Sequence, residues 1–213
     1  CEVSFEERFE EVVRLKEEGT KEYKAERWLQ AQAHYHSAAQ LLLDEPPSGC
    51  APLNQIDAPN GKEEMAREIV ISCWLNEAQC ALKRELWSAA EKACDLVLLR
   101  LADPLGRDRE QHVKALFRRG RARLMKSEFE RARKDLKNAA ALAPNSKEVR
   151  EALHECKRRE LEGRARSDAV FSKMAAKKVL YRDKGLLVRP PRRSSNPRVY
   201  FDIQIGDYRE GSL

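Results

Sequence analysis

A fixed arrangement of small and large apolar residues recurs along the chain. In the clearest copy, small, aromatic, small, large, small and helix-ending positions follow one another within about 34 residues, at Gly120, Phe129, Ala132, Leu136, Ala139 and Pro144. Small residues let two antiparallel helices approach closely, and the proline ends the second helix. The pattern therefore predicts a helix-turn-helix unit, and an all-α fold where the unit repeats.

Two further copies fit the same frame. One has Gly19, Trp28, Ala31, Tyr35 and Ala38, and the other has Trp74, Ala78, Trp87, Ala90 and Cys94. The copies begin at residues 12, 71 and 113, so they are 59 (71 − 12) and 42 (113 − 71) residues apart. Both intervals exceed the ideal period, and prolines and glycines fall between the copies. We therefore predict a lead-in over 1–11 that starts the first helix, and a domain over 12–145 with repeats at 12–45, 71–104 and 113–146 and inserted loops.

The pattern changes twice after the third repeat. Apolar residues at helical spacing among many Arg and Lys predict a long basic capping helix over 146–182. The run from Arg189 to Ser195, rich in proline and arginine, predicts a linker over 183–195. Beyond it, Val199, Phe201 and Ile203 alternate with more polar residues, which predicts one β-strand within 196–213.

The composition of the chain limits which partners and classes of function can be expected. A formal net charge of +6 favours acidic partners, which include acidic peptides, nucleic acid and anionic membranes. The six cysteines form no CxxC pair and the four histidines no metal-ligand spacing, so we expect reduced core cysteines, no metal and no cofactor. No GxSxG motif or phosphate-binding loop supports an enzyme. No apolar run approaches the ~20 residues of a membrane span, so we expect a cytoplasmic or nuclear location and no membrane partner.

Several polar residues converge on one predicted surface. In stacked helical hairpins the first helices line a common groove, and these helices carry Lys16, Thr20, Asn76, Lys114 and Arg118. Lys16 and Thr20 are spaced i, i+4, as are Lys114 and Arg118, so each pair shares a helix face. Cations and donors of this kind suit a ligand with several carboxylates, such as a C-terminal Asp. The sequence thus predicts a groove for an acidic C-terminal peptide.

These residues resemble the carboxylate-clamp tetratricopeptide-repeat (TPR) domains of co-chaperones, and those of FKBP-type immunophilins in particular. The matching segments are 16–20, 76–83 and 114–120, and the resemblance covers about residues 5–180. It implies three TPR repeats in a right-handed superhelix. It also implies that Lys16, Asn76, Lys114 and Arg118 grip the Glu-Glu-Val-Asp C-terminus of the ninety-kilodalton heat-shock chaperone, with the seventy-kilodalton chaperone as an alternative. Thr20 stands where many clamps have a second Asn, and Gln111 is a peripheral peptide-binding candidate.

The two ends of the chain resemble other immunophilin parts. Residues 196–213 are similar to the first strand of a cyclophilin, and residues 1–3 to the tail of an FKBP-type domain. The resemblance implies a dual-family immunophilin with FKBP, TPR and cyclophilin parts. The parent protein is then expected to be a peptidyl-prolyl cis-trans isomerase whose catalytic residues lie outside this chain, which itself has none.

A second function class rests on the basic helix and linker. Their cations, including Arg164, Arg166 and Lys173, form a candidate contact for calmodulin or nucleic acid. A solvated helix face is the favoured interpretation, because aromatic residues that could stack on bases are sparse there.

Overall fold

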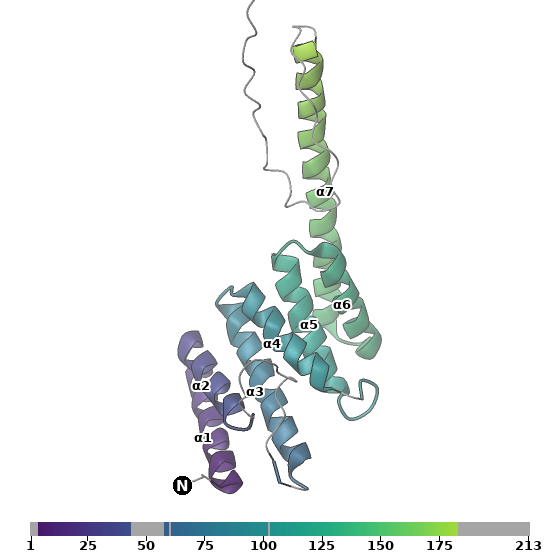
Figure 1. Cartoon of the computed structure of the whole chain (residues 1–213). Coiled ribbons are helices and arrows are strands. Elements are labelled where there is room, and N and C mark those ends of the chain that lie inside the picture. The colour runs from purple at the N-terminus through teal and green to yellow at the C-terminus, as the bar shows by residue number, and fades with distance from the viewer. Residues whose placement is uncertain (1–3, 44–57, 60, 102, 183–213) are drawn as a thin grey trace, which may run out of the picture. The chain divides into compact units, whose positions relative to one another are not determined.

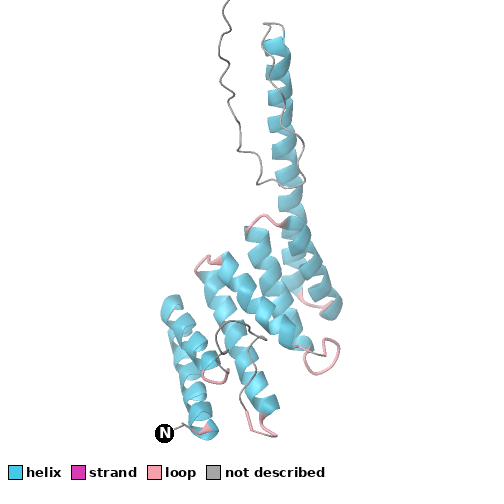
Figure 2. Cartoon of the chain, in the orientation of Figure 1, coloured by secondary structure: helices cyan, strands magenta, loops and turns pink. Residues whose placement is uncertain are grey.

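The computed structural model describes residues 4–43, 58–59, 61–101 and 103–182. These residues form seven α-helices, as the all-α prediction required (Figure 2). Their bounds are α1 Phe5–Lys24, α2 Trp28–Gln40, α3 Glu63–Lys83, α4 Trp87–Arg100, α5 Arg109–Met125, α6 Phe129–Leu142 and α7 Lys147–Arg182. The predicted linker over 183–195, the strand within 196–213 and most of the first insertion lie outside the described residues.

The first helices of the repeats begin earlier than the predicted repeat starts. Helix α1 begins at Phe5, where Ser4 forms a capping box with Glu7, and this box satisfies backbone N–H groups that a helix start leaves free. Helix α3 begins at Glu63 and α5 at Arg109. The extra turns carry apolar residues such as Phe5 and Ala66 into the core, so burial extends each helix beyond the minimal hairpin.

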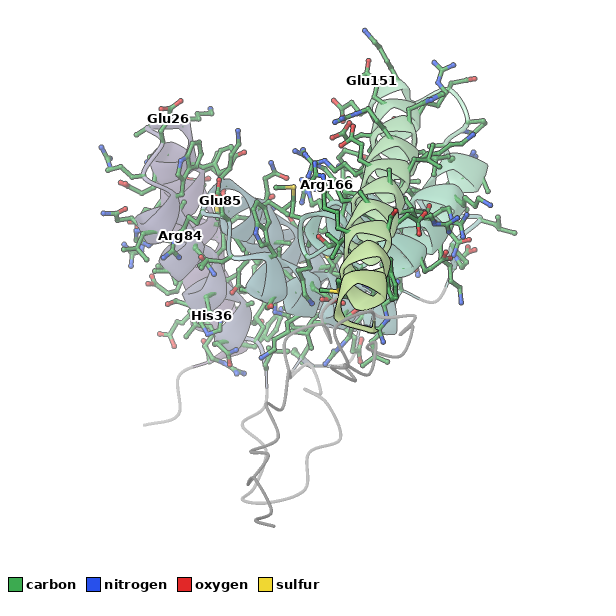
Figure 3. All side chains as sticks on the ribbon, turned by 90° about the horizontal axis from the view of Figure 1, so that it is seen from above. Glu26, His36, Arg84, Glu85, Glu151 and Arg166 are labelled. Atoms are coloured by element: carbon green, nitrogen blue, oxygen red, sulfur yellow. The ribbon has the colours of Figure 1, made fainter. Side chains whose placement is uncertain are left out.

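The turns inside the three repeats share one unusual backbone conformation. Glu26, Glu85 and Ser127 have φ of 58°, 58° and 61°, and Figure 3 labels the first two. They are 59 (85 − 26) and 42 (127 − 85) residues apart, which matches the predicted spacing. In each turn the N–H of the next residue donates to a carbonyl five residues earlier, which is the Schellman ending of a helix. The three turns therefore recur at the same intervals as the three repeats.

An arginine near the start of each first helix donates to a carbonyl at the C-terminus of the second helix in the same repeat. Carbonyls at that end have no partner within their own helix. The three contacts, which we call arginine ties, are Arg8 Nη1 to Leu41 O at 3.4 Å, Arg67 Nη1 to Arg100 O at 3.4 Å and Arg109 Nε to Leu142 O at 2.8 Å. Donor and acceptor are 33 residues apart each time. Each tie therefore closes its own repeat.

The helices of residues 4–142 pack mainly on their neighbours in sequence, and the first helices of the repeats also contact one another. Each helix from α1 to α6 packs on the next, and α3 also packs on α1 and α5 (Figure 1). Within the described residues no such contact joins α2, α4 and α6 to one another. Gly19 allows a close approach inside repeat one, since a Cβ there would lie 2.9 Å from Tyr35 Cε1. The first helices thus line the inner face of the stack.

Helix α7 begins as a cap on the third repeat. Val149 is buried beside Leu116, and Cys156 is buried beside Leu136. These contacts cover apolar surface that the last hairpin would otherwise expose, as expected of a terminal capping element. Contacts divide the chain into compact units at 1–158 and 159–213, and the rest of α7 belongs to the second unit.

Candidate peptide-binding groove

All five residues predicted to hold a carboxylate lie on the first helices of the repeats. Lys16 and Thr20 are on α1, Asn76 is on α3, and Lys114 and Arg118 are on α5. Asn76 and Arg118 occupy the same position in successive repeats, because 118 − 76 equals the 42-residue interval between those repeats. Since α3 packs on both α1 and α5, the three helices present these side chains from adjacent positions on the inner face.

Arg118 is the candidate cation that bonds to a neighbouring first helix. It is half-buried, and its Nη1 donates to the carbonyl of Leu75, the residue before Asn76. Loss of water around the guanidinium lowers the pKa of Arg118, which reflects the cost of holding a charge there. Within the described residues Arg118 forms no ion pair with a carboxylate.

Two other half-buried arginines in the domain, Arg67 and Arg119, are paired with carboxylates. Arg67 Nη2 lies 2.9 Å from Asp108 Oδ1, and Arg119 Nη2 lies 2.7 Å from Asp135 Oδ1. Both carboxylates are buried, so each pair neutralises its charge within the fold. Arg118 therefore differs from these arginines, and an external anion would complete its surroundings.

The buried cysteines near the groove supply no negative charge. Burial raises the pKa of the Cys73 thiol to about 12, and the Lys16 ammonium opposes this rise in pKa. Burial likewise raises the pKa of Cys80 to about 11 and of Cys94 to about 12, with Arg118 opposing both shifts in pKa. These thiols stay protonated near neutral pH and so add no negative charge beside Lys16 or Arg118.

Thr20 is held by two internal hydrogen bonds. Its Oγ1 donates to the carbonyl of Lys16 at 2.9 Å, and it lies 3.1 Å from the hydroxyl oxygen of Tyr35. A hydroxyl has a single proton, so in this arrangement Thr20 has none left for a ligand. The prediction that Thr20 donates to a carboxylate therefore requires its proton to turn away from the helix carbonyl.

The remaining candidates are more accessible. Asn76 is half-buried, and its amide has no hydrogen-bond partner among the described residues. Lys114 is exposed and pairs with Glu110, one turn earlier on α5, at 2.5 Å. Exposed pairs of this kind contribute little, so a ligand carboxylate can replace Glu110. Gln111 Oε1 is buried without a hydrogen-bond partner, which leaves its peripheral role a prediction.

Two neighbours of the candidate site were not predicted from the sequence. Tyr35 was assigned only to the core, and Glu110 was not singled out. Tyr35 could have been found by comparing the repeats. Cys94 and Leu136 occupy the same position in the other two repeats, so only repeat one has a hydroxyl there. The signal for Glu110 was its i, i+4 spacing from Lys114.

The basic part of α7 carries mixed charge. Arg164 Nη2 lies 2.6 Å from Glu160 Oε1, and Arg166 Nη2 lies 3.8 Å from Glu162 Oε2. Two of the cations assigned to a calmodulin or nucleic-acid contact are thus paired along their own helix. That alternative stays a prediction.

The described residues offer no membrane span and no metal site. Among the residues that the structure describes, no helix combines the length and the apolar character needed to cross a bilayer. In that same part of the chain, no group of His, Cys, Asp or Glu side chains converges in a way that would hold a metal ion. Four cysteines, Cys73, Cys80, Cys94 and Cys156, are buried free thiols, as predicted for the core.

The sequence of the chain is similar to those of known proteins. No protein-family model matches it. Human peptidyl-prolyl cis-trans isomerase FKBP4 is 30% identical over 173 residues, which cover 81% of this chain and 34% of that protein. The chain thus spans about a third of the length of this curated relative.

Solved structures agree with this relationship. The C-terminal TPR-containing domain of an FK506-binding protein from Plasmodium falciparum superposes with a TM-score of 0.63 and 25% identity, covering 77% of this chain and 97% of that one. The first TPR domain of Spaghetti (RPAP3), bound to the HSP90 peptide SRMEEVD, has a TM-score of 0.50 and 21% identity over 70% of this chain and 92% of that one. The chain is a TPR domain homologous to the FKBP-type immunophilins.

Proposed function

We propose that the chain is a co-chaperone docking module that binds the acidic Glu-Glu-Val-Asp C-terminus of the ninety-kilodalton heat-shock chaperone. The observation that carries the proposal is Arg118, a half-buried guanidinium with no carboxylate partner among the described residues, which donates to the carbonyl of the residue before Asn76. A peptide carboxylate would supply the missing charge, through bonds that contribute about 1.5–3 kcal/mol each. The HSP90 peptide in the similar RPAP3 structure ends in the same four residues.

Each clamp residue has a distinct task in this proposal. Arg118 grips a carboxylate with its fork of N–H donors, while Lys114 and Lys16 act as movable point charges on either side. Asn76 donates from between them. The seventy-kilodalton chaperone is a second candidate partner, because a terminal carboxylate beside an Asp side chain meets the same cations.

The test is a calorimetric titration with the peptide Ser-Arg-Met-Glu-Glu-Val-Asp as free acid and as C-terminal amide. We expect the free acid to bind and the amide to bind at least tenfold more weakly, since amidation removes a charge-assisted bond. Arg118→Ala and Lys114→Ala should each weaken binding of the acid about tenfold or more. Arg131→Ala removes an exposed cation from α6 and serves as the matched control. Equal binding of acid and amide would refute the proposal.

We also propose that the chain is part of a longer protein with peptidyl-prolyl isomerase activity, on the strength of homology to FKBP4. The chain described here contributes docking and no chemistry. A protease-coupled assay of prolyl isomerisation with this chain alone should show only the uncatalysed rate, and acceleration above that rate would assign catalysis to the chain itself.

A further inference from the structure

Tyr35 is a core residue whose hydroxyl contacts Thr20 of the candidate site. Only 3% of its surface is exposed, and its ring packs against Gly19, which leaves space for it. Among the described residues, the only hydrogen-bond partner of its hydroxyl is Thr20 Oγ1, 3.1 Å away. Burial raises the pKa of the Tyr35 phenol, so its proton is retained near neutral pH.

The direction of the bond follows from the number of protons. A buried hydroxyl places its proton on a partner, so Tyr35 donates to Thr20 Oγ1. Thr20 then places its own proton on the Lys16 carbonyl at 2.9 Å. That carbonyl lies inside α1 and also accepts the helical N–H four residues on, so it can release the threonine proton without being left unsatisfied.

The same position in the other repeats shows that the helices pack without this hydroxyl. Counting 59 and then 42 residues from Tyr35 leads to Cys94 and Leu136, both buried. A Cβ at Gly120 would lie 2.9 Å from Leu136 Cγ, as one at Gly19 would from Tyr35 Cε1. An aliphatic side chain therefore fills this position in repeat three. Helix packing alone does not require the Tyr35 hydroxyl in repeat one.

We propose that Tyr35 is a positioning residue of the peptide groove. It donates to Thr20 Oγ1 and so directs the single threonine proton toward the ligand carboxylate when the peptide enters. Donation into a hydroxyl strengthens that hydroxyl as a donor, because hydrogen bonds in a chain polarise one another. The Tyr35–Thr20 pair thereby replaces the second amide that many carboxylate clamps carry. This inference rests on the proposed function.

The test uses Tyr35→Phe, Thr20→Val and Thr20→Ser, alone and with Tyr35→Phe, titrated with the same acid and amide peptides. Thr20→Val should weaken binding of the acid about tenfold, and Tyr35→Phe about threefold, from the strength of charge-assisted and polarised bonds. Thr20→Ser keeps a hydroxyl and should retain both near-normal binding and the threefold effect of Tyr35→Phe. With Thr20→Val present, Tyr35→Phe should change the affinity no further. Binding of the amide should respond to none of these changes.

The outcomes separate the two proposals. If the unaltered chain binds acid and amide equally, the proposed function fails. If it prefers the acid but Tyr35→Phe binds as tightly, or if its effect persists beside Thr20→Val, the positioning role of Tyr35 is wrong while the groove stands. Thermal melting of each variant distinguishes a lost fold from a lost contact, since a merely structural role would lower the melting temperature and leave acid and amide affinities in the same ratio.

Discussion

Asp135 offers the sharpest test of how the third repeat is held together. Only 2% of its surface is exposed. Its carboxylate accepts from Arg119 Nε at 2.9 Å, Arg119 Nη2 at 2.7 Å and Arg123 Nη1 at 2.8 Å. Asp135→Ala removes all three bonds and leaves two guanidinium groups with side chains only 18% and 14% exposed.

The cost follows from what remains. Breaking a buried ion pair by removing one partner costs about 3–5 kcal/mol. Arg119 keeps Asp95 and Arg123 keeps Glu91, so we expect the lower end, about 3 kcal/mol. For a domain of this size that corresponds to a fall in melting temperature of about 6–12 °C.

The assay is urea unfolding followed by circular dichroism, with Asp95→Ala as the matched control. Asp95 binds the same Arg119 but is 49% exposed, so its loss should cost less than about 1 kcal/mol. A cost below about 1 kcal/mol for Asp135→Ala, or equal costs for the two variants, would show that the buried network contributes no more than a surface pair.

Three further predictions concern other parts of the domain. Glu110→Gln should tighten binding of the acidic peptide about two- to threefold in calorimetry, because the carboxylate that competes for Lys114 is removed; unchanged affinity would show that Lys114 is not used. Ser127→Gly should raise the free energy of unfolding by about 0.5–1 kcal/mol, since φ of 61° strains a residue with a side chain; a lower melting temperature would contradict this. Burial raises the pKa of the Cys73 thiol to about 12, so iodoacetamide at pH 8 should leave it unmodified in the folded chain and modify it in urea, as read by mass spectrometry.

The helical hairpins could be predicted because the spacing of their small and large residues fits only one kind of structure. Gly19 and Gly120 mark close helix approaches, and the intervals of 59 and 42 residues recur in the turn conformations at Glu26, Glu85 and Ser127. The lead-in over 1–11 was predicted to start the first helix, whereas the earlier starts of α3 and α5 were not predicted, because a minimal hairpin frame ignores apolar residues such as Ala66 that lengthen a helix by burial.

The sequence predicted which helices carry the candidate residues but not the hydrogen bonds that these residues form. The repeat frame places Lys16, Asn76 and Arg118 on neighbouring helices, and the structure has them there. Which way the proton of Thr20 points depends on Tyr35, which lies fifteen residues away on another helix. Within the described residues, no carboxylate pairs with Arg118. This depends on which Asp and Glu side chains pair with the other arginines, and the sequence does not show those pairings.

The arginine ties have a consequence for how the chain can change in length. Each tie joins residues 33 apart, and the stretches between ties are 25 (67 − 41 − 1) and 8 (109 − 100 − 1) residues long. These stretches lie outside every closed repeat, and lengthening a connection adds only slowly to its entropic cost. Related chains should therefore gain and lose residues between the ties, while the number of residues between the donor and acceptor of each tie stays constant. The ties thus mark the units in which such a domain can be cut, extended or recombined.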